Sequence, residues 1–491
     1  MQQALVHAHA LLSAGRLAEA RRQCQSVLRS SPRQTDWLHL AGLVEWRAGD
    51  TALAERLLLA AVALQADRVD SLEVLAQLRL QAGRPADALE AAQAAERADS
   101  RRAQAPLLAA NALWLLGRPT QALDSLDRAL ARDASLLPAH LYRALLLKEQ
   151  GRHAEAQQAL DRVLALDPQH VTALLNRGAV RQSQGQLQAA RADYEQVLAI
   201  DPAQALPHAY LGLLDAHEGL ADLARARYQR ALQADPDCSV AHDLLARLDL
   251  AQGRFDSGWL HHERRFVDRP DGWARALAGR PAWDGRANGA RLLLVAEQGV
   301  GDQILHCSQL DELRQRASVA LLVAHGKLLP LLQRSFPGLA LHDAAQPLPA
   351  VDFTHVLRTG SLGRWLRPDL AAFSNAPATW LRDDAQRTRQ LLDALPQGPG
   401  PLVGLSWRSA MPEVGSAKSM SLVELLQALD GLGPLRLVNL QYGDVAGEID
   451  AAQRATGLQV HQVAGVDPFN DLDALASLMR HCQAVVSTSN S

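Results

Sequence analysis

The sequence predicts an α-solenoid of repeated helix pairs, followed by two α/β lobes of which the second is incomplete. Three observations support this fold class. A 34-residue period fills residues 1–272; two later segments each place a short apolar run before a loop and a helix; and the remaining residues are too few for two complete lobes. The predicted domains are the array (1–272), a linker (273–290), a first lobe (291–395) and a second lobe (400–491).

The repeat is defined by small residues at fixed positions. Glycine recurs at positions 15, 49, 83, 117, 151, 185, 219 and 253, and alanine or glycine stands seven residues before each one. A small residue lets two helices approach closely, and a glycine supplies the turn between them. Asp-Pro at 167–168, 201–202 and 235–236 ends the second helix of a unit. Each unit is therefore predicted to be a helix–turn–helix.

This pattern resembles the tetratricopeptide repeat. The resemblance implies stacked units whose groove binds a protein or peptide partner. It also places the second, fifth, ninth and twelfth residue of each unit toward the groove. That set includes His39, Glu73, Asn111, Trp46, Trp114 and Lys148. The two tryptophans are either exposed anchors or, as we favour, packed between adjacent repeats.

The eighth unit departs from the pattern in its second helix, AQGRFDSGWLHHERRF. Consecutive His261 and His262 would point about 100° apart on a helix, and the HExxH spacing of zinc sites is absent. We therefore predict no metal here, and a capping or docking helix that leads into the next domain.

The second half reads as strand–loop–helix units. Residues 292–295 form an apolar run that precedes the loop 297–302 and a helix predicted from Gln303 to about Arg316; further strands are predicted at 319–323 and 353–357. After the break at 395–401, the second lobe is predicted to contain strands at 402–407, 435–440 and 484–487, a polar loop at 408–419 and a helix at 422–429. Ligands of such sheets bind at the carboxyl ends of the strands.

Three known motifs are not matched by this sequence. Ile304 stands where a dinucleotide-binding fingerprint needs its third glycine, and the GxxxxGK[ST] motif of P-loop ATPases does not occur. The segment Gly404–Arg408 is similar to a nucleophile elbow, but Arg408 replaces its final glycine. These absences argue against a dehydrogenase, a P-loop ATPase and a serine hydrolase.

The segments GWLHHERRF, PAWDG, LLLVAEQGVGDQILHCSQL, VGLSWRS, AKSMSL, LVNLQYGDV, DLDALASLM and AVVSTSNS resemble the heptosyltransferases of glycosyltransferase family 9, and bacterial tetratricopeptide proteins that carry this domain. The resemblance implies a GT-B fold of twin Rossmann-like lobes. It implies inverting transfer of a hexose or heptose from a nucleotide sugar to an acceptor, without metal or cofactor. The acceptor is expected to be a protein recruited by the repeats. The alternative is a repeat scaffold whose GT-B domain is catalytically silent.

The resemblance also assigns roles to residues of the first-lobe loop. Asp302 matches the proposed general base, which would take a proton from the acceptor hydroxyl. Asp302 could equally cap the following helix, and the two roles are compatible. Gly299 and Gly301 supply loop backbone.

On the second lobe, Lys418 matches the lysine that meets the diphosphate, and Arg408 could assist it. Only three residues of the chain are lysine, which makes a chance match less probable. Loop residues Gln441, Gly443 and Asp444 are expected near the base or ribose. Ser489 and Asn490 occupy a donor loop, but Ser489 replaces the usual aspartate. The helix that normally follows is missing after Ser491, so an incomplete lobe with weak or absent donor binding is expected.

The composition and the cysteine spacing also limit the classes of protein to which this chain can belong. A net charge of −3 argues against a dedicated nucleic-acid binder. The four cysteines are far apart, no apolar run reaches the roughly 18 residues that span a bilayer, and the N-terminus lacks a signal-peptide pattern. We therefore expect a soluble, cytoplasmic protein.

Overall fold

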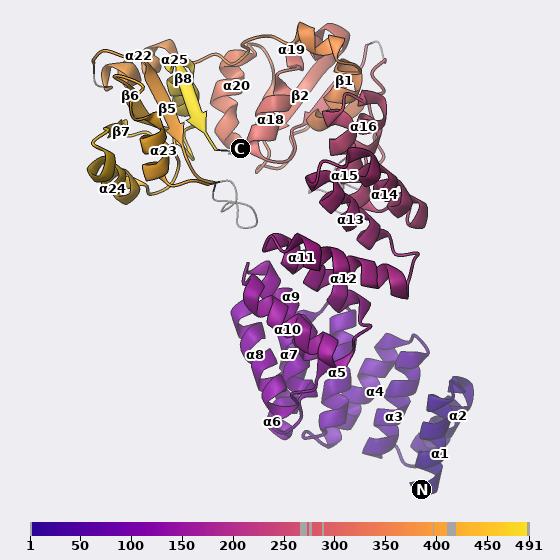
Figure 1. The fold of residues 1–491 in the computed structure, drawn as a ribbon. Coiled ribbons are helices and arrows are strands. Elements are labelled where there is room, and N and C mark those ends of the chain that lie inside the picture. Colours follow the sequence, from indigo (N-terminus) through magenta and orange to yellow (C-terminus); the bar gives the residue numbers. More distant parts are fainter. Residues whose placement is uncertain are drawn as a thin grey trace. The chain divides into compact units, whose positions relative to one another are not determined.

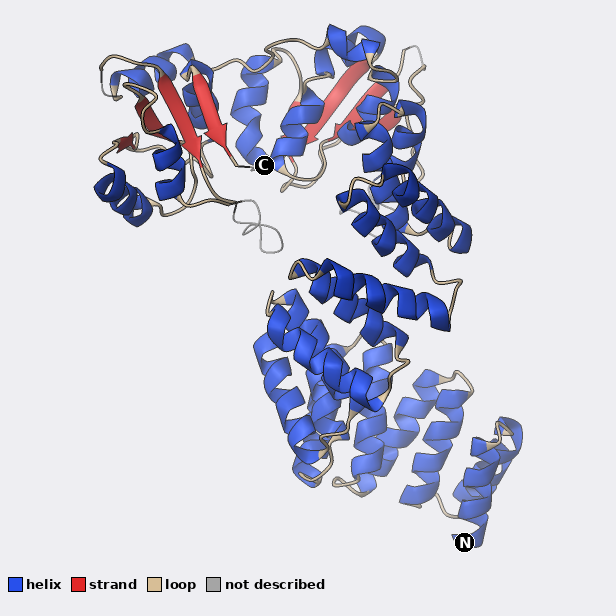
Figure 2. Cartoon of the chain, viewed as in Figure 1, coloured by secondary structure: helices blue, strands red, loops and turns tan. Residues whose placement is uncertain are grey.

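A computed structural model describes residues 2–265, 273, 277–286, 289–395, 397–409 and 419–488. The chain divides into two compact units, Met1–Ala203 and Gln204–Ser491. In the described residues, strands occur only in the second unit (Figure 2).

The first unit consists of six helix pairs, which Figure 1 draws in indigo to magenta. Their bounds are α1 Gln2–Ser13, α2 Leu17–Ser30, α3 Thr35–Arg47, α4 Thr51–Leu64, α5 Val69–Gln81, α6 Pro85–Ala98, α7 Gln104–Leu115, α8 Pro119–Arg132, α9 Leu137–Glu149, α10 His153–Leu166, α11 Val171–Ser183 and α12 Leu187–Ile200. The second unit begins with two more pairs, α13 Ala205–His217 with α14 Ala221–Ala234, and α15 Ser239–Ala251 with α16 Phe255–His262. These sixteen helices confirm the predicted solenoid of tetratricopeptide repeats.

The repeated small residues act as predicted. The eight turn glycines all have φ between 69° and 90°, the left-handed region that side chains disfavour. Inside the helices, an added Cβ at Gly178 would lie 2.4 Å from Cε1 of Tyr194, and one at Gly212 would lie 2.5 Å from Cε1 of Tyr228. Both tyrosines are buried, so the missing side chain makes room for a ring of the partner helix.

The rest of the second unit contains two four-stranded parallel sheets. The first has the order β3-β2-β1-β4, with β1 Arg291–Val295, β2 Ser318–Ala324, β3 Leu341–Asp343 and β4 His355–Arg358. The second has the order β7-β6-β5-β8, with β5 Leu402–Ser406, β6 Arg436–Asn439, β7 Val460–His461 and β8 Ala484–Ser487. In each sheet the chain moves outward from a central first strand in one direction and then adds its last strand on the other side, as in a doubly wound lobe.

Short helices connect these strands. In the first lobe they are α18 Val300–Cys307, α19 Leu310–Arg316, α20 Leu329–Ser335 and α21 Leu362–Leu366, with the 3₁₀ segments η1 Gly326–Leu328, η2 Thr359–Ser361 and η3 Ala371–Asn375. The second lobe has α22 Ala385–Asp393, α23 Leu422–Leu429, α24 Ala446–Thr456 and α25 Leu472–His481.

The central strand β1 is buried from Leu292 to Val295, whereas β8 lies at a sheet edge with Val485 39% exposed.

The structure corrects the prediction around the glycine loop. The helix predicted from Gln303 to Arg316 begins three residues earlier, at Val300, and is interrupted between Cys307 and Leu310. Strands β3 and β7 were not predicted, because segments of three and two residues give too little alternation to recognise. The second half thus forms small parallel sheets, and a GT-B arrangement of them stays a prediction.

Candidate functional site

The tryptophans of the repeats pack between neighbouring units. Trp46 Nε1 donates to Gln81 Oε1 of the next repeat at 3.0 Å, and Trp114 Nε1 donates to Glu149 Oε2 at 2.9 Å. Both rings are partly buried against the main helical core. The favoured prediction, packing rather than exposed anchoring, is confirmed.

Three of the other expected groove residues have polar partners: His39 and Lys148 contact the adjacent repeat, and Glu73 contacts the end of its own unit. His39 Nδ1 lies 2.9 Å from Ser71 Oγ, Arg102 Nη1 donates to Glu73 Oε2 at 2.9 Å, and Lys148 Nζ donates to Asn176 Oδ1 at 2.7 Å. Asn111 is half-buried in α7. The contacts of His39 and Lys148 join successive repeats, so part of the polar lining of the array is structural.

A pocket of about 250 Å³ nevertheless remains in this lining, and its walls are formed by His39, Asp70, Glu73, Val74, Gln77, Gln104 and Leu108. Burial lowers the pKa of His39 to about 4, so its imidazole is neutral at pH 7. Burial also raises the pKa of Glu73, although Arg102 opposes that rise.

Asp302 lies at the start of α18, beyond the carboxyl end of β1. Its Oδ2 accepts a hydrogen bond from the Gly299 backbone N–H at 3.2 Å, so the carboxylate reaches back over the first turn of the helix. The helix-capping alternative therefore holds, with Asp302 as the third helical residue rather than the residue before the helix. The side chain is half-buried.

The loop before Asp302 has a restricted backbone. Gln298 has φ of 62°, the only non-glycine residue with positive φ in the described chain. Its carbonyl accepts from Gln303 Nε2 at 3.3 Å, and Gln303 Oε1 accepts from the His325 backbone N–H at 3.0 Å, at the end of β2. Two neighbouring strand ends are thus tied together through the buried Gln303.

Sequence reasoning missed a buried ion pair at this loop. Glu297 Oε1 accepts from Arg265 Nε at 3.0 Å and from Nη2 at 2.6 Å, and Arg265 Nη2 also donates to Ser361 Oγ at 3.0 Å. The side chains of Glu297 and Arg265 are 2% and 9% exposed. Burial raises the pKa of Glu297, while Arg265 and Arg358 oppose the rise. The only available signal was that both residues fall in segments that resemble the glycosyltransferases.

The predicted docking role of the eighth unit is confirmed. Trp259 Nε1 in α16 donates to the Arg367 carbonyl at 2.8 Å, and a Cβ on Gly363 would lie 2.3 Å from the Trp259 ring. Phe255 packs against Phe373 with ring centroids 5.3 Å apart. Together with Arg265, this helix is built into the first α/β lobe.

On the second lobe, Gln441 joins the ends of β5 and β6. Its Oε1 accepts from the Trp407 and Arg408 backbone N–H groups, both at 2.9 Å, and from Ser406 Oγ at 3.2 Å. The residue is fully buried. The structure therefore gives Gln441 a positioning role, and contact with a nucleotide stays a prediction.

Arg408, Gly443 and Asp444 lie together beyond these strand ends. Arg408 Nε donates to Glu448 Oε1 at 3.0 Å, and Nη2 donates to the Asp444 carbonyl at 3.4 Å. Gly443 has φ of 90°, as the turn after β6 requires. Three of the predicted donor-site residues, Lys418, Ser489 and Asn490, lie outside the described residues.

The described residues contain neither a cluster suited to a metal ion nor a helix suited to span a membrane. No group of three or more His, Cys, Asp or Glu residues in this part of the chain is placed to hold a metal ion. Among the helices that the structure describes, none is both long enough and apolar enough to cross a membrane.

Comparison with known proteins supports the repeats. Residues 5–69, 74–136 and 141–205 match the tetratricopeptide repeat family. FlbA of Caulobacter vibrioides is 28% identical over 250 residues, and the match covers 48% of this chain and 42% of FlbA. The chain thus spans less than half the length of this curated relative.

Among solved structures, MamA is 22% identical with a TM-score of 0.31, covering 32% of this chain and 92% of MamA. A tetratricopeptide repeat protein from Parabacteroides merdae is 18% identical with a TM-score of 0.40, covering 51% of this chain and 98% of its own. YrrB, described as having an unusual peptide-binding site, is 17% identical with a TM-score of 0.33, covering 38% and 95%.

Proposed function

We propose that the repeat array binds a protein or peptide partner, so that the protein acts as an interaction scaffold. The observation that carries this proposal is the run of stacked helix pairs, because repeats of this kind form extended surfaces that recognise polypeptides. The polar pocket lined by Asp70, Glu73 and Gln77, with Gln104 of the next repeat, offers one opening on that surface between successive repeats.

Site-specific photocrosslinking tests the proposal in cells. A photoreactive amino acid at Gln77, an exposed residue of the pocket, should give a discrete crosslinked species, whereas one at Glu90, an exposed residue of the second helix of that repeat, should not. Equal crosslinking at both positions, or none at either, would contradict binding at the groove.

We also propose that the α/β lobes transfer a sugar from a nucleotide-sugar donor to an acceptor. Two parallel sheets with polar residues beyond their strand ends support the proposal, as does the resemblance of both loops to family 9 glycosyltransferases. In the proposed step the acceptor oxygen attacks the anomeric carbon and the bond to the diphosphate breaks. The diphosphate leaves with the electron pair, and Asp302 takes the hydroxyl proton. Arg408 and Lys418 would face the negative charge of the departing diphosphate.

Asp302→Asn separates catalysis from helix capping. The amide oxygen of asparagine can still accept the Gly299 N–H, so stability should hold, but asparagine cannot take the proton. Transfer from UDP-, GDP- or ADP-sugars, followed as release of the nucleoside diphosphate, should fall by about 100-fold or more. Asp311→Asn, at an exposed carboxylate of α19, is the matched control. Absence of nucleotide release by the parent protein, together with no thermal stabilisation by any nucleotide, would leave the scaffold as the function of the whole chain.

A further inference from the structure

The pocket of about 250 Å³ on the repeat array spans the first helices of three successive repeats. Its wall contains His39 from α3, residues 70–77 of α5, and Gln104 and Leu108 from α7. The volume is below the roughly 300–1,000 Å³ typical of pockets for drug-sized ligands. The pocket is therefore suited to one side chain of a bound polypeptide.

The carboxylates beside this pocket outnumber the cations. Arg102 Nη1 lies 2.7 Å from Asp70 Oδ1 and 2.9 Å from Glu73 Oε2, so two carboxylates share one guanidinium. The nearby Arg68 is paired with Asp36 at 2.6 Å, so it supplies no second cation. These five residues therefore leave one negative charge uncompensated.

Asp70 presents this charge at the surface. Its side chain is 53% exposed, whereas the side chain of Glu73 is only 12% exposed. Within the described residues Arg102 is the one ion-pair partner of Asp70. The carboxylate of Asp70 is thus open to a further cation that arrives from solvent.

His39 adds an uncharged polar group to the wall of the same pocket. The residue is 8% exposed, and its Nδ1 lies 2.9 Å from Oγ of the buried Ser71. In the part of the chain that the structure describes, its Nε2 forms no hydrogen bond. When Nδ1 carries the proton, Nε2 can accept from an N–H donor of a ligand. Burial lowers the pKa of His39 to about 4, so the ring adds no positive charge at pH 7.

An apolar surface lies beside these polar groups. Val74 and Leu108 contribute it from neighbouring repeats. Long basic side chains bury their methylene stems on apolar surface and keep the cation in polar surroundings. An inorganic cation would gain nothing from this surface, so the arrangement favours arginine or lysine.

We propose that the partner of the array places one arginine or lysine side chain in this pocket, with its cation at Asp70 and His39 Nε2 and its stem on Val74 and Leu108. The inference rests on the proposed binding of a polypeptide by the repeats, and it adds that one position of the bound segment is basic. We expect arginine to bind more tightly than lysine, because its planar fork of donors can reach a carboxylate and an imidazole together.

Peptides selected from a random display library on the full chain provide the probe. Only peptides that also crosslink to a photoreactive residue at Gln77 are kept. The kept peptides should share one arginine or lysine position. Replacing arginine with citrulline, or lysine with acetyl-lysine, removes the charge and should weaken binding by about tenfold in fluorescence anisotropy. Added NaCl should weaken binding of the charged peptide more than that of the uncharged one.

Variants of the chain assign the effect to the pocket. Asp70→Asn should weaken the charged peptide by about tenfold, whereas Glu90→Gln, at an exposed carboxylate on the second helix of the same repeat, should change binding by less than about twofold. In Asp70→Asn the charged and uncharged peptides should bind almost equally, because the two groups act as a pair.

The outcomes separate this inference from the scaffold proposal. Kept peptides without a required basic residue would overturn the inference alone, as would a charge effect of the same size in the parent chain and in Asp70→Asn. Failure to obtain any peptide that crosslinks at Gln77 would overturn both. The citrulline and salt comparisons use the unaltered pocket carboxylate, so they decide the matter even if Asp70→Asn folds poorly.

Discussion

Replacing Gly178 with alanine should destabilise its repeat by about 1–2 kcal/mol. The new Cβ would lie 2.4 Å from Cε1 of Tyr194 and 2.9 Å from Cδ1 and Cζ, well inside van der Waals contact. The ring is fully buried, and its hydroxyl donates to Gln182 Oε1 at 3.2 Å, so it cannot move freely. Overpacking costs about 1–3 kcal/mol, and a ring held in this way places the cost in the upper part of that range, at about 2–3 kcal/mol, of which the better helix propensity of alanine returns about 1 kcal/mol.

Hydrogen exchange followed by mass spectrometry measures this effect locally. Peptides from α11 and α12 should exchange about 5- to 30-fold faster in Gly178→Ala, provided that exchange reports the opening equilibrium. Tyr194→Leu supplies the decisive background, because repeat five carries Ala144 and Leu160 at the same two positions. In that background the alanine should slow exchange rather than accelerate it.

A control isolates helix propensity from the clash. Gly447→Ala in α24 adds a Cβ that meets nothing within 4 Å, so peptides covering 446–456 should exchange no faster. The reasoning would be refuted if Gly178→Ala left exchange unchanged, or if it accelerated exchange equally with tyrosine and with leucine at position 194. Either result would show that contact with the Tyr194 ring is not the reason why position 178 of the repeat requires a small residue.

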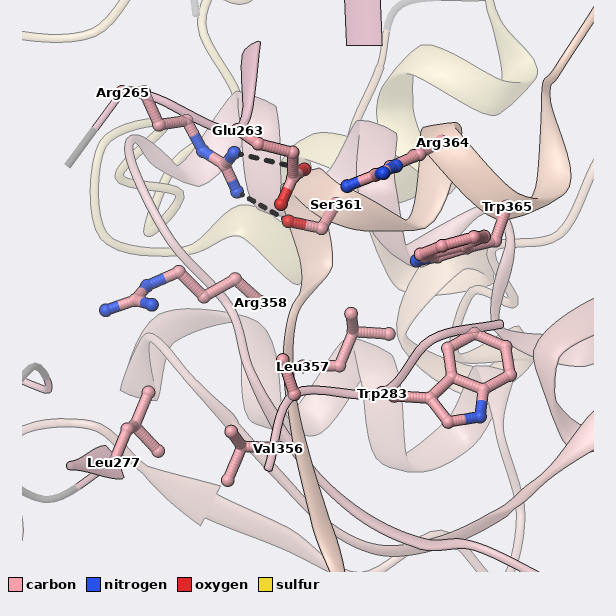
Figure 3. Close-up of a pocket in the computed structure, with 11 residues that line it drawn as sticks. Glu263, Arg265, Leu277, Trp283, Val356, Leu357, Arg358, Ser361, Arg364 and Trp365 are labelled. Carbon is pink, nitrogen blue, oxygen red and sulfur yellow. Dashed lines mark hydrogen bonds and ion pairs between the residues drawn. The ribbon is translucent and has the colours of Figure 1, made fainter. Parts of the chain in front are cut away.

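Two further predictions concern charge. Glu297→Gln removes the more buried of the two carboxylates that Arg265 contacts, with Glu263 remaining 3.5 Å away (Figure 3), and should lower the free energy of unfolding of the α/β part by up to about 3 kcal/mol in urea titrations. The same change at the exposed Glu155 should cost less than about 1 kcal/mol, and equal losses would contradict the burial argument. Acidification from pH 6.5 to 4 should destabilise the protein, because burial lowers the pKa of His39 and of His262 to about 4 and the unfolded chain therefore binds protons that the native state excludes. His39→Asn should flatten part of this dependence in urea titrations at several pH values, and an unchanged slope would exclude His39 as a source.

The parts of the fold that could be predicted depend on residues that act locally. A glycine turn, a small residue opposite a large one and an Asp-Pro break each indicate the local structure of a single repeat unit. Eight copies make the pattern unmistakable, so the repeats and the packing of Trp46 and Trp114 were predicted correctly. The buried strand at 292–295 was equally visible, because every one of its residues is apolar.

The missed features depend on distant residues meeting in space. Glu297 and Arg265 are 32 residues apart, and nothing in either segment indicates that both side chains are buried. Gln441 looks like an ordinary loop residue until β5 and β6 lie side by side and bring three donors to its oxygen. A capping role for Asp302 was predicted, but its place as the third helical residue depends on where α18 begins.

The embedding of α16 in the first lobe limits how this protein can be rearranged. Trp259 fills the space above Gly363, and Arg265 neutralises a carboxylate at the strand end, so the last repeat supplies structural parts to its neighbour. Exchange of the repeats upstream of α15 would leave these contacts intact, whereas a junction that removes Trp259 would leave the space above Gly363 unfilled, and one that also removes Arg265 would take away an ion-pair partner of the buried Glu297. Repeats that are inserted or exchanged upstream of α15 should therefore leave the α/β part intact while they change the partner that is recognised. The α/β part itself should be moved to another protein only together with α16.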